Sequence, residues 1–494
     1  MSEQFDLVII GAGPGGYSTA LRAAELGMKV ALVERDATVG GTCLNRGCIP
    51  SKALITATHT IDTVHRAAEL GVNASVNGID FGTLRDYRLR VVKTMVGGLA
   101  GLLAHRGITV FRANATFHAD ETAPATSNHI VHLVPSPDQS DILTYHKADV
   151  PEPSGPTMDL TATNIVVATG AKPRPLPGNP FAGALIDSTQ ALEVNEFPSS
   201  AVIIGAGAIA LEFASMWNAA GSKVTLLIRK DRVLPDRRAG TTLTRELKRH
   251  GVNIITRASV THVDTGANLG ATVHYTREGQ DGEQSVWGEI ALVAIGRDPI
   301  TDPAWGVTID DHGHVATDAY GRTDKPGVWA VGDVTAGHAL AHRAFEQGIV
   351  IAETIAGLNP KPVDEATVPQ IVFSFPEAAS VGLTVEQAQA REDLIEIKET
   401  NYPMLANARM LMSGTAGSLT IVSGCDAANP DTPRVLGVHM VSQMASDIIA
   451  EAEQLVGNHV PLADAARLVH PHPTFSETLG EAPLKADGRP LHTR

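Results

Sequence analysis

The chain has little cysteine, little aromatic surface and no excess of positive charge, and each shortage excludes a class of protein. Only three cysteines occur in 494 residues, which excludes the disulfide framework of a small secreted protein. The formal net charge is −15 and aromatic residues make up 4%, so the chain offers no basic, base-stacking surface for nucleic acid. We therefore expect no nucleic-acid partner.

Long apolar runs are also missing. The most apolar window, residues 201–220, contains two glycines and Glu212, so a buried strand, a tight turn and a helix explain it better than a membrane span. The first residues carry no basic stretch ahead of an apolar run, which argues against a secretory signal. We expect no membrane partner and a reducing, cytoplasmic setting, where a close cysteine pair indicates redox or metal chemistry.

The chain is too long for one hydrophobic core, since single cores stop growing at about 250–300 residues. Its length predicts about three domains. Two segments, Asp6–Glu34 and Ala201–Ile228, repeat one pattern of apolar strand, glycine turn, helix and second strand. Parallel strands need a crossover of this kind, so two nucleotide-binding sheets are predicted. Between them, Glu121–Pro156 is polar and is predicted to form loops joining short antiparallel strands.

The first glycine turn has the spacing of a dinucleotide-binding fingerprint. Gly11 permits the tight turn, Gly13 lets the backbone approach a pyrophosphate, and Gly16 lets the helix pack closely on the strand. Glu34 ends the second strand, where a carboxylate can accept hydrogen bonds from ribose hydroxyls. The alternative is a glycine-rich turn in another α/β domain; the strand, helix and acid together favour a dinucleotide.

The second turn is less regular. Gly205 and Gly207 match the fingerprint, and Ala210 is a tolerated third small residue. An isoleucine stands where the ribose-binding acid is expected, and Arg229 and Lys230 follow it. An arginine there would pair with a 2′-phosphate and favour NADP, whereas surface charges of this kind are usually only solvated. Both interpretations stay open at this point.

A third element, residues 323–333, runs from a turn into a strand that ends on Gly332 and Asp333. An acid at the carboxyl end of a strand suits ligand hydroxyls. It would equally suit a cap on the helix that follows.

Cys43 and Cys48 are the pair that carries redox chemistry. On a regular helix their Cα atoms would lie about 8–9 Å apart, and a disulfide needs less than about 7 Å. We therefore expect the pair to straddle a bent helix start at Gly47, where free N–H groups, Arg46 and Lys52 should lower the thiol pKa values. Two structural thiols or half a zinc site are the alternatives, but zinc wants four ligands and no second cysteine pair exists.

A histidine and a carboxylate stand close together near the other end of the chain. Glu477 follows His472 by five residues, and a bond from the carboxylate to one ring nitrogen would leave the other free as a base or acid. A single histidine is usually structural, so the spacing alone does not decide.

With these motifs in place, the chain resembles the flavoprotein (pyridine nucleotide) disulfide oxidoreductases, most closely the dihydrolipoamide dehydrogenases among them. The resemblance runs nearly end to end, and the pairing of the cysteine block with the histidine block is highly specific. The segments that carry it are Gly11–Gly16, Cys43–Lys52, Ala168–Gly170, Gly205–Glu212, Gly296–Arg297, Gly332–Asp333, Leu340–His342, Phe375–Glu377 and His472–Glu477.

This resemblance implies an α/β fold with two Rossmann-like dinucleotide-binding domains and an α+β C-terminal dimerisation domain. The implied boundaries are 1–172 for the FAD-binding domain, 173–287 for the NAD(P)-binding domain, 288–360 for a return to the central FAD-binding domain, and 361–494 for the dimer-interface domain. The implied cofactors are FAD and NAD, with NADP as the alternative.

The resemblance also implies roles for single residues. Cys43 would be the interchange thiol that meets substrate, and Cys48 the thiolate that faces the flavin. His472, oriented by Glu477, would reach the active site of the other subunit, which makes the protein a homodimer. The implied cofactor contacts are Gly11, Gly13, Gly16, Glu34, Lys52, Gly170, Gly205, Gly207, Glu212, Arg229, Gly296, Asp333 and Ala341, with Lys52 and Glu212 paired near the flavin.

The implied reaction oxidises dihydrolipoyl groups and reduces NAD⁺ through the cysteine pair and FAD. The implied partners are lipoyl domains of 2-oxo acid dehydrogenase or glycine cleavage complexes. The second turn and Arg229 keep an NADPH-dependent reductase of the glutathione reductase type as an alternative. A non-catalytic flavin-binding scaffold is an alternative of another class, which the intact cysteines, His472 and Glu477 disfavour.

Overall fold

The structure, a computed structural model, describes residues 3–119, 128–148, 150–266 and 270–493. The chain divides into two units, each assembled from segments that are distant in sequence. Unit 1 comprises Met1–Ala53, Gly82–Pro173 and Arg297–Glu365, and unit 2 comprises Leu54–Phe81, Arg174–Gly296 and Ala366–Arg494.

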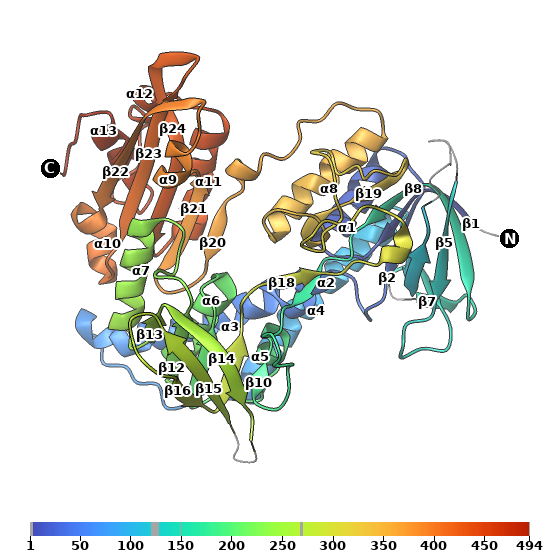
Figure 1. Ribbon diagram of the computed structural model, residues 1–494, viewed down its shortest axis with the longest axis horizontal. Coiled ribbons are helices and arrows are strands. Elements are labelled where there is room, and N and C mark those ends of the chain that lie inside the picture. Colours follow the sequence, from blue (N-terminus) through green and yellow to red (C-terminus); the bar gives the residue numbers. More distant parts are fainter. Residues whose placement is uncertain (1–2, 120–127, 149, 267–269, 494) are drawn as a thin grey trace. The chain divides into compact units, whose positions relative to one another are not determined.

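The strand that leads into the first glycine turn is central to the sheet of unit 1. Strand β1 (Glu3–Ile10) pairs in parallel with β2 (Val30–Glu34) on one side and with β8 (Met158–Val167) on the other (Figure 1). Its last four residues are all buried, as expected for a parallel strand that is covered on both faces. The other strands of this sheet are β3 (Thr109–Arg112), β4 (Asn114–Phe117), β5 (His129–Val134), β6 (Leu143–Lys147), β7 (Val150–Pro153) and β19 (Val328–Ala330).

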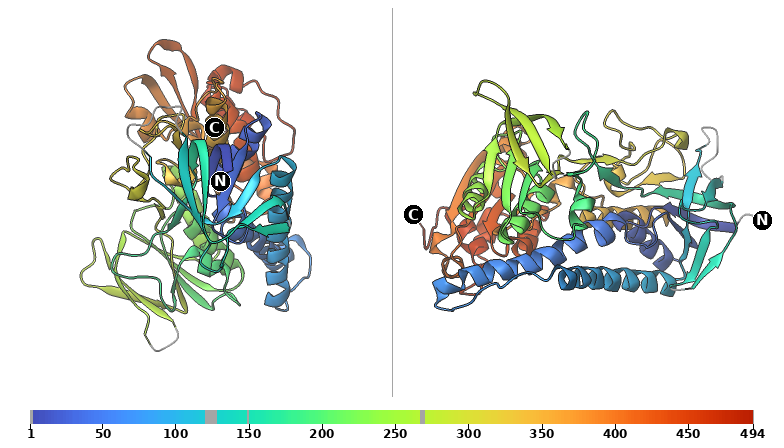
Figure 2. Two further views of the ribbon diagram at one scale, coloured as in Figure 1. Left: turned by 90° about the vertical axis from the view of Figure 1, so that its right-hand side faces the viewer. Right: turned by 90° about the horizontal axis from the view of Figure 1, so that it is seen from below.

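Helices pack on this sheet, and apolar side chains of the helices and the strands form the core between them. Helix α4 (Phe81–His105) is long, and its Leu99 and Leu103 join a buried apolar cluster with Leu7 and Leu32 of the sheet (Figure 2). The other helices of unit 1 are α1 (Pro14–Glu25), α2 (Gly41–Arg46), the first residues of α3 (Cys48–Arg66), and α8 (Ala341–Ile355), with short turns η2 (Pro303–Trp305) and η3 (Gly332–Val334). A small ribbon pairs β9 (Ala171–Pro173) with β18 (Arg297–Pro299).

The polar stretch Glu121–Pro156 contains short antiparallel strands, as predicted. Strand β5 runs antiparallel to β8, and β6 runs antiparallel to β7. Positions 121–127 and 149 of that prediction lie outside the described residues.

The second glycine turn lies in a parallel sheet of unit 2. Helix α6 (Ala208–Ala219) connects β11 (Ser200–Ile204) to β12 (Lys223–Ile228), and the strand order is β10-β17-β11-β12-β13. The remaining strands and helices here are β10 (Leu185–Ile186), β13 (Asn253–Thr256), β17 (Ile290–Val293), α5 (Ser188–Leu192) and α7 (Arg237–Arg249). A separate antiparallel sheet consists of β14 (Ala258–Asp264), β15 (Ala271–Arg277) and β16 (Gln284–Gly288).

The C-terminal part of unit 2 is an antiparallel sheet with helices packed on it. Its strand order is β20-β21-β24-β23-β22, and Cys425 is buried in β23. The strands are β20 (Gln370–Val372), β21 (Glu377–Gly382), β22 (Leu394–Pro403), β23 (Ser418–Asp426) and β24 (Asn429–Ser442). The helices are α9 (Val385–Gln389), α10 (Ala408–Ser413), α11 (Ala445–Gly457), α12 (Leu462–Ala465) and α13 (Thr478–Ala486). Elsewhere the chain has short turns, and these include η1 (Ala67–Leu70), η4 (Glu365–Thr367) and η5 (Met404–Ala406).

These arrangements confirm the predicted fold class of two Rossmann-like sheets and an α+β C-terminal region. The apolar window 201–220 separates into β11, the glycine turn and α6. Within the described ranges, no helix is both long enough and apolar enough to cross a membrane. The domain boundaries at 172, 287 and 360 stay a prediction.

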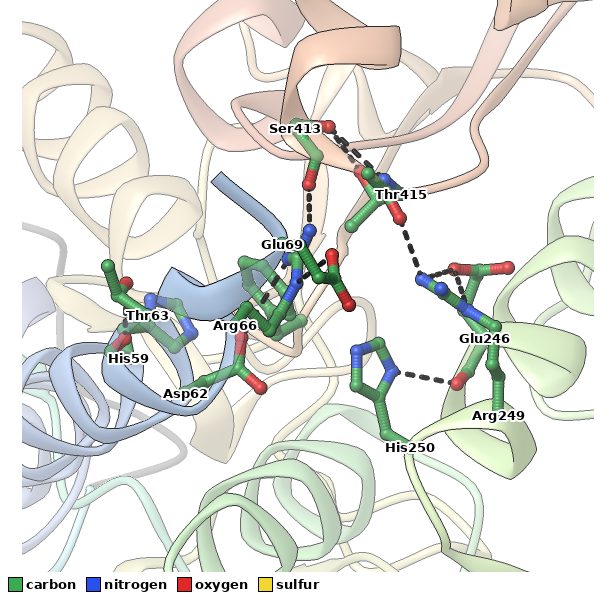
Figure 3. A network of polar contacts seen from close by, with 12 residues as sticks. His59, Asp62, Thr63, Arg66, Glu69, Glu246, Arg249, His250, Ser413 and Thr415 are labelled. Atoms are coloured by element: carbon green, nitrogen blue, oxygen red, sulfur yellow. Dashed lines mark hydrogen bonds and ion pairs between the residues drawn. The ribbon is translucent and has the colours of Figure 1, made fainter. Parts of the chain in front are cut away.

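Polar contacts of Glu246, Arg249 and Arg66 hold the 413–416 segment within unit 2 (Figure 3). Glu246 of α7 is 2% exposed and accepts hydrogen bonds from the Arg249 guanidinium at 2.8 Å and from the Ala416 backbone N–H at 3.3 Å. Arg249 also donates to the Gly414 carbonyl at 3.0 Å, and Arg66 at the end of α3 donates to the Ser413 carbonyl. The ends of α3 and α7 are therefore tied to the 413–416 segment.

We expect Glu246→Ala to lower the thermal unfolding midpoint of the purified protein. The substitution leaves the Ala416 N–H without its acceptor, which typically costs about 1–3 kcal/mol of stability. Glu278→Ala is the matched control, because Glu278 is exposed and lies 3.8 Å from an exposed Arg257. Calorimetry that gives equal midpoints for the two variants would contradict this account of the network.

Candidate active site

The first glycine turn leaves an open helix N-terminus in unit 1. Helix α1 begins after Gly13 with no side-chain cap, so its first N–H groups remain available to an anion. Gly11 has φ +106°, and a Cβ there would lie 2.3 Å from the Ala168 carbonyl oxygen; a Cβ at Gly16 would lie 1.9 Å from the Gly11 carbonyl oxygen. A Cβ at Gly13 would meet nothing closer than 3.9 Å. The fold itself requires Gly11 and Gly16, whereas Gly13 keeps space free for a ligand.

Glu34 lines a cavity of a size that suits a small-molecule ligand. Its carboxylate accepts the backbone N–H groups of Ala12 and Asp36, each at 2.9 Å, and burial raises its pKa. The cavity measures about 480 Å³, within the size range of small-molecule sites. Its lining includes Glu34, Val39, Val96, Ala100, Ile108 and Tyr145.

The second glycine turn repeats this arrangement in unit 2. Gly205 has φ +139°, and a Cβ there would lie 2.2 Å from the Ala294 carbonyl oxygen. Gly207 precedes α6, which again has no side-chain cap, and a Cβ at Gly207 would have no neighbour within 4 Å. Arg229 and Lys230 are exposed just after β12.

The remaining predicted cofactor residues occupy turns and helix starts. Gly170 follows β8 with φ +71° and open space around its Cα, and Gly296 has φ +132°. Ala341 is the first residue of α8, whose N-terminus also lacks a side-chain cap. Asp333 lies in η3 and Leu340 is the N-cap of α8, so Asp333 does not cap that helix.

Asp333 is a partly buried carboxylate, and this burial raises its pKa. The positive charges of Arg297 and Arg343 oppose that shift, and the Arg297 Nε lies 3.9 Å from the Asp333 carboxylate. A carboxylate close to Cys43 at this position is suited to accept hydrogen bonds from ligand hydroxyls.

The two cysteines of unit 1 straddle a helix break, as predicted. Helix α2 ends at Arg46, Gly47 interrupts it, and α3 begins at Cys48. A Cβ at Gly47 would lie 3.0 Å from the Thr42 carbonyl oxygen, so a side chain would be crowded there. Cys43 and Cys48 are free thiols that hydrogen bond to each other.

The predicted lowering of the thiol pKa values was wrong for Cys43. Its pKa is raised, first by the hydrogen bond with Cys48, then by burial and by the negative charge of Cys48, while Lys52 opposes the shift. Arg46 pairs with Asp36 at 2.6 Å. The two sulfurs are coupled, so a negative charge on one opposes ionisation of the other.

Tyr17 is a neighbour of the thiols that the sequence interpretation missed. It lies in α1 directly after Gly16, and burial together with Cys43 and Cys48 raises its pKa to about 12. Its ring contacts Phe345, with 5.7 Å between the ring centroids. At neutral pH the phenol is protonated, so it adds no charge beside the thiols. The feature of the sequence that could have pointed to Tyr17 is its position directly after Gly16, the third glycine of the fingerprint.

The predicted histidine and glutamate are in contact in unit 2. His472 Nδ1 lies 2.7 Å from a Glu477 carboxylate oxygen, and the imidazole is 74% exposed. With Glu477 ionised, Nδ1 carries the proton and Nε2 is left as a base. Asn407, buried and also missed, donates to the second Glu477 oxygen at 2.9 Å and to the Thr474 carbonyl at 2.9 Å. Both carboxylate oxygens are thus fixed.

The structure brings the predicted residues together in two groups. Cys43, Cys48, Lys52 and Asp333 are neighbours in unit 1. In unit 2, His472 contacts Glu477, and the buried Glu212 accepts the Phe373 N–H at 3.2 Å. Lys52 and Glu212 belong to different units, so their pairing stays a prediction.

Comparison with known families identifies the class of this fold and site. The pyridine nucleotide-disulphide oxidoreductase family matches residues 5–348, and the dimerisation domain of the same family matches residues 368–483. The chain belongs to this family. The predicted enzyme class and the predicted use of FAD and NAD(P) are confirmed, and the matched dimerisation domain supports the predicted homodimer.

Particular relatives are similar over their full length. The chain is 35% identical to a dihydrolipoyl dehydrogenase of Bacillus subtilis (strain 168), covering 99% of this chain and 97% of the relative. It is 34% identical to that of Chlamydia trachomatis, covering 100% and 99%. Among solved structures, LpdA from Mycobacterium tuberculosis superposes with a TM-score of 0.83 at 25% identity, covering 98% of this chain and 99% of that one. The HOCl-induced flavoprotein disulfide reductase RclA from Escherichia coli, solved as a Cu(II) complex, gives 0.79 at 26%, covering 98% and 99%.

We expect Gly13→Ala to fold but to lose flavin. The added methyl clashes with no protein atom, yet it occupies the space at the α1 N-terminus that a pyrophosphate needs. Flavin absorbance per protein after extensive dialysis measures the effect. Gly101→Ala is the matched control, because a Cβ there would meet no neighbour within 4 Å and the residue lies on an exposed part of α4. A full flavin complement in Gly13→Ala would contradict the assignment.

Proposed function

We propose that the chain is a dihydrolipoyl dehydrogenase that moves electrons from a dithiol through its cysteine pair and FAD to NAD⁺. The observation that carries the proposal is the Cys43–Cys48 pair, two sulfurs that hydrogen bond to each other close to the partly buried Asp333. The His472–Glu477 contact supplies the base that a thiol substrate needs. The full-length similarity to dihydrolipoyl dehydrogenases supports this choice within the family.

The first half of the reaction is thiol–disulfide exchange. His472 Nε2 takes the proton of one substrate thiol, and the thiolate attacks Cys43 in the oxidised Cys43–Cys48 disulfide. A substrate–Cys43 disulfide forms and Cys48 leaves as a thiolate. The second substrate thiol then releases its proton to solvent and attacks the substrate sulfur of that bond, which releases Cys43 and the cyclic disulfide product.

His472 returns a proton to the departing Cys43 sulfur, and the negative charge left on Cys48 favours the proton on Cys43. The substrate has lost two electrons, and the protein pair has gained them as one thiol and one thiolate. FAD would be held at the open α1 N-terminus beside Gly13 and Glu34, and it would supply the acceptor through which this electron pair reaches NAD⁺.

Glu477 and Asn407 position the base. Glu477 accepts from His472 Nδ1 and stabilises the imidazolium that forms when Nε2 takes a proton. The amide nitrogen of Asn407 donates to the other carboxylate oxygen of Glu477. The amide oxygen of Asn407 caps α10 by accepting the Met410 N–H at 2.9 Å. The carboxylate therefore cannot rotate away from the ring without breaking a buried hydrogen bond.

The dimerisation domain offers the surface for a second subunit. Its exposed apolar side chains include Val469, which is 97% exposed and close in sequence to His472, and large exposed apolar surface indicates an interface. The others on this domain include Leu405, Leu411, Met412 and Leu468. We propose that His472 acts on the cysteine pair of the other subunit, so that only the homodimer completes a site.

The substrate is a dihydrolipoyl group carried by a lipoyl domain of a 2-oxo acid dehydrogenase or glycine cleavage complex, and the setting is the cytoplasm. NAD⁺ is the proposed acceptor. The exposed Arg229 and Lys230 favour the second candidate, an NADPH-dependent disulfide reductase, because both could meet a 2′-phosphate. Nearby, Arg232 pairs with Asp231 at 3.1 Å and is less available for that role.

We expect steady-state turnover of dihydrolipoamide to be much faster with NAD⁺ than with NADP⁺. The double variant Arg229→Ala, Lys230→Ala should keep its NAD⁺ turnover, since solvated surface charges contribute little to binding. Absorbance of the reduced nicotinamide measures both. The absence of turnover with either acceptor, together with NADPH-driven reduction of glutathione disulfide, would move the protein to the second candidate.

We expect His472→Gln to lower kcat for dihydrolipoamide by about 10²–10⁴, the usual contribution of general base catalysis. Electron transfer from NADH to a small artificial acceptor should stay within about twofold of wild type, since that route needs no substrate thiol to be deprotonated. His132→Gln serves as a control for histidine replacement, because His132 is exposed on β5 in unit 1. Equal loss in both assays would show a structural role for His472 instead.

A further inference from the structure

A cluster of imidazoles and carboxylates lies on the β14–β16 sheet of unit 2, apart from every residue used above. We propose that His262, His274 and Asp264 form a binding site for a divalent transition-metal cation such as Zn²⁺ or Cu²⁺, with Glu283 facing the opposite edge of the two imidazoles. The proposal goes beyond the redox reaction and does not depend on it.

Strand pairing places the two histidines side by side. His262 of β14 is the cross-strand partner of His274 of β15 (yellow-green in Figure 1), and such partners carry side chains on the same face. Their rings stack with centroids 4.1 Å apart and planes 9° from parallel. Asp264 follows His262 by two residues and so projects to the same face. The register of β14 shifts just before His262, and such bulges often redirect side chains toward a site.

Each edge of the stacked imidazole pair faces one carboxylate. On one edge, the Nε2 atoms of His262 and His274 lie 4.0 Å and 3.1 Å from the same oxygen of Asp264. On the other edge, their Nδ1 atoms lie 3.8 Å and 3.6 Å from the two oxygens of Glu283. Two nitrogens and an oxygen therefore converge on the Asp264 edge from three separate side chains.

The spacing is close to that of a metal coordination shell. Zinc–nitrogen bonds of about 2.0–2.1 Å in a tetrahedron set the ligand atoms about 3.3 Å apart. The ligand atoms of His262, Asp264 and His274 already lie within 4.8 Å of one another. Rotation of the two imidazoles out of their stacked arrangement would direct both Nε2 lone pairs at one cation.

The kinds of ligand atom select the cation. Imidazole nitrogen with carboxylate oxygen suits Zn²⁺, Cu²⁺ and Ni²⁺, whereas Mg²⁺ and Ca²⁺ prefer oxygen alone. Glu283 is oriented by Thr261, whose hydroxyl donates to it at 2.6 Å, a supporting contact of the type that tunes metal sites. All four side chains reach the surface, so a hydrated cation has access.

The reduced cysteine pair would also bind such metals, so the experiment uses the FAD-loaded protein with Cys43 and Cys48 oxidised to the disulfide. Equilibrium dialysis against Zn²⁺ should find one more bound equivalent per chain in wild type than in His262→Gln or His274→Gln. Cu²⁺ added at one equivalent should give an electron paramagnetic resonance spectrum with coupling to two nitrogens, reduced to one in either variant.

Matched variants keep the result interpretable. His132→Gln is the control, because His132 faces a single carboxylate, Asp159 at 2.6 Å, with no second imidazole in contact among the described residues. Asp264→Asn tests the carboxylate without removing a histidine and should weaken Zn²⁺ binding about tenfold or more. Flavin content and thermal midpoint like those of wild type establish that each variant is folded. Equal Zn²⁺ binding by wild type and both histidine variants, or no binding by wild type, would overturn the proposal.

Discussion

The hydrogen bond between Cys43 and Cys48 is the interaction on which the chemistry of unit 1 depends. It exists because α2 stops at Arg46 and α3 restarts at Cys48, with Gly47 between them. The same block is fixed to the dinucleotide turn, where the Gly40 N–H donates to the Ala12 carbonyl at 2.8 Å. The position of the sulfurs and the geometry of the open α1 N-terminus are therefore set together.

The pair differs from two independent reactive cysteines because a negative charge on one sulfur opposes a negative charge on the other. Lys52 favours a first negative charge, whereas Asp333 opposes it. The proposed reaction leaves that charge on Cys48 and the proton on Cys43. His472 and Glu477, the proposed base, lie in the unit that contains the matched dimerisation domain, and the imidazole is open to solvent.

The sequence allowed prediction of features that depend on local pattern. The two strand–turn–helix units, the break at Gly47 and the contact between His472 and Glu477 all follow from spacing along the chain. The roles of Tyr17 and Asn407 could not be predicted, because each depends on contacts between distant segments. The predicted direction of the Cys43 pKa shift was wrong for the same reason. The shift depends on the hydrogen bond with Cys48 and on burial, neither of which is visible in the order of residues.

The central claim is that Cys48 is the ionised sulfur and faces the flavin, while Cys43 is the protonated sulfur that meets substrate. The most direct measurement is the visible absorbance of the FAD-loaded variants Cys43→Ser and Cys48→Ser at neutral pH. A thiolate in contact with oxidised flavin adds a charge-transfer band at wavelengths longer than those of the flavin itself. The account predicts this band in Cys43→Ser, where Cys48 remains, and its absence in Cys48→Ser. A band in Cys48→Ser and none in Cys43→Ser would contradict the account.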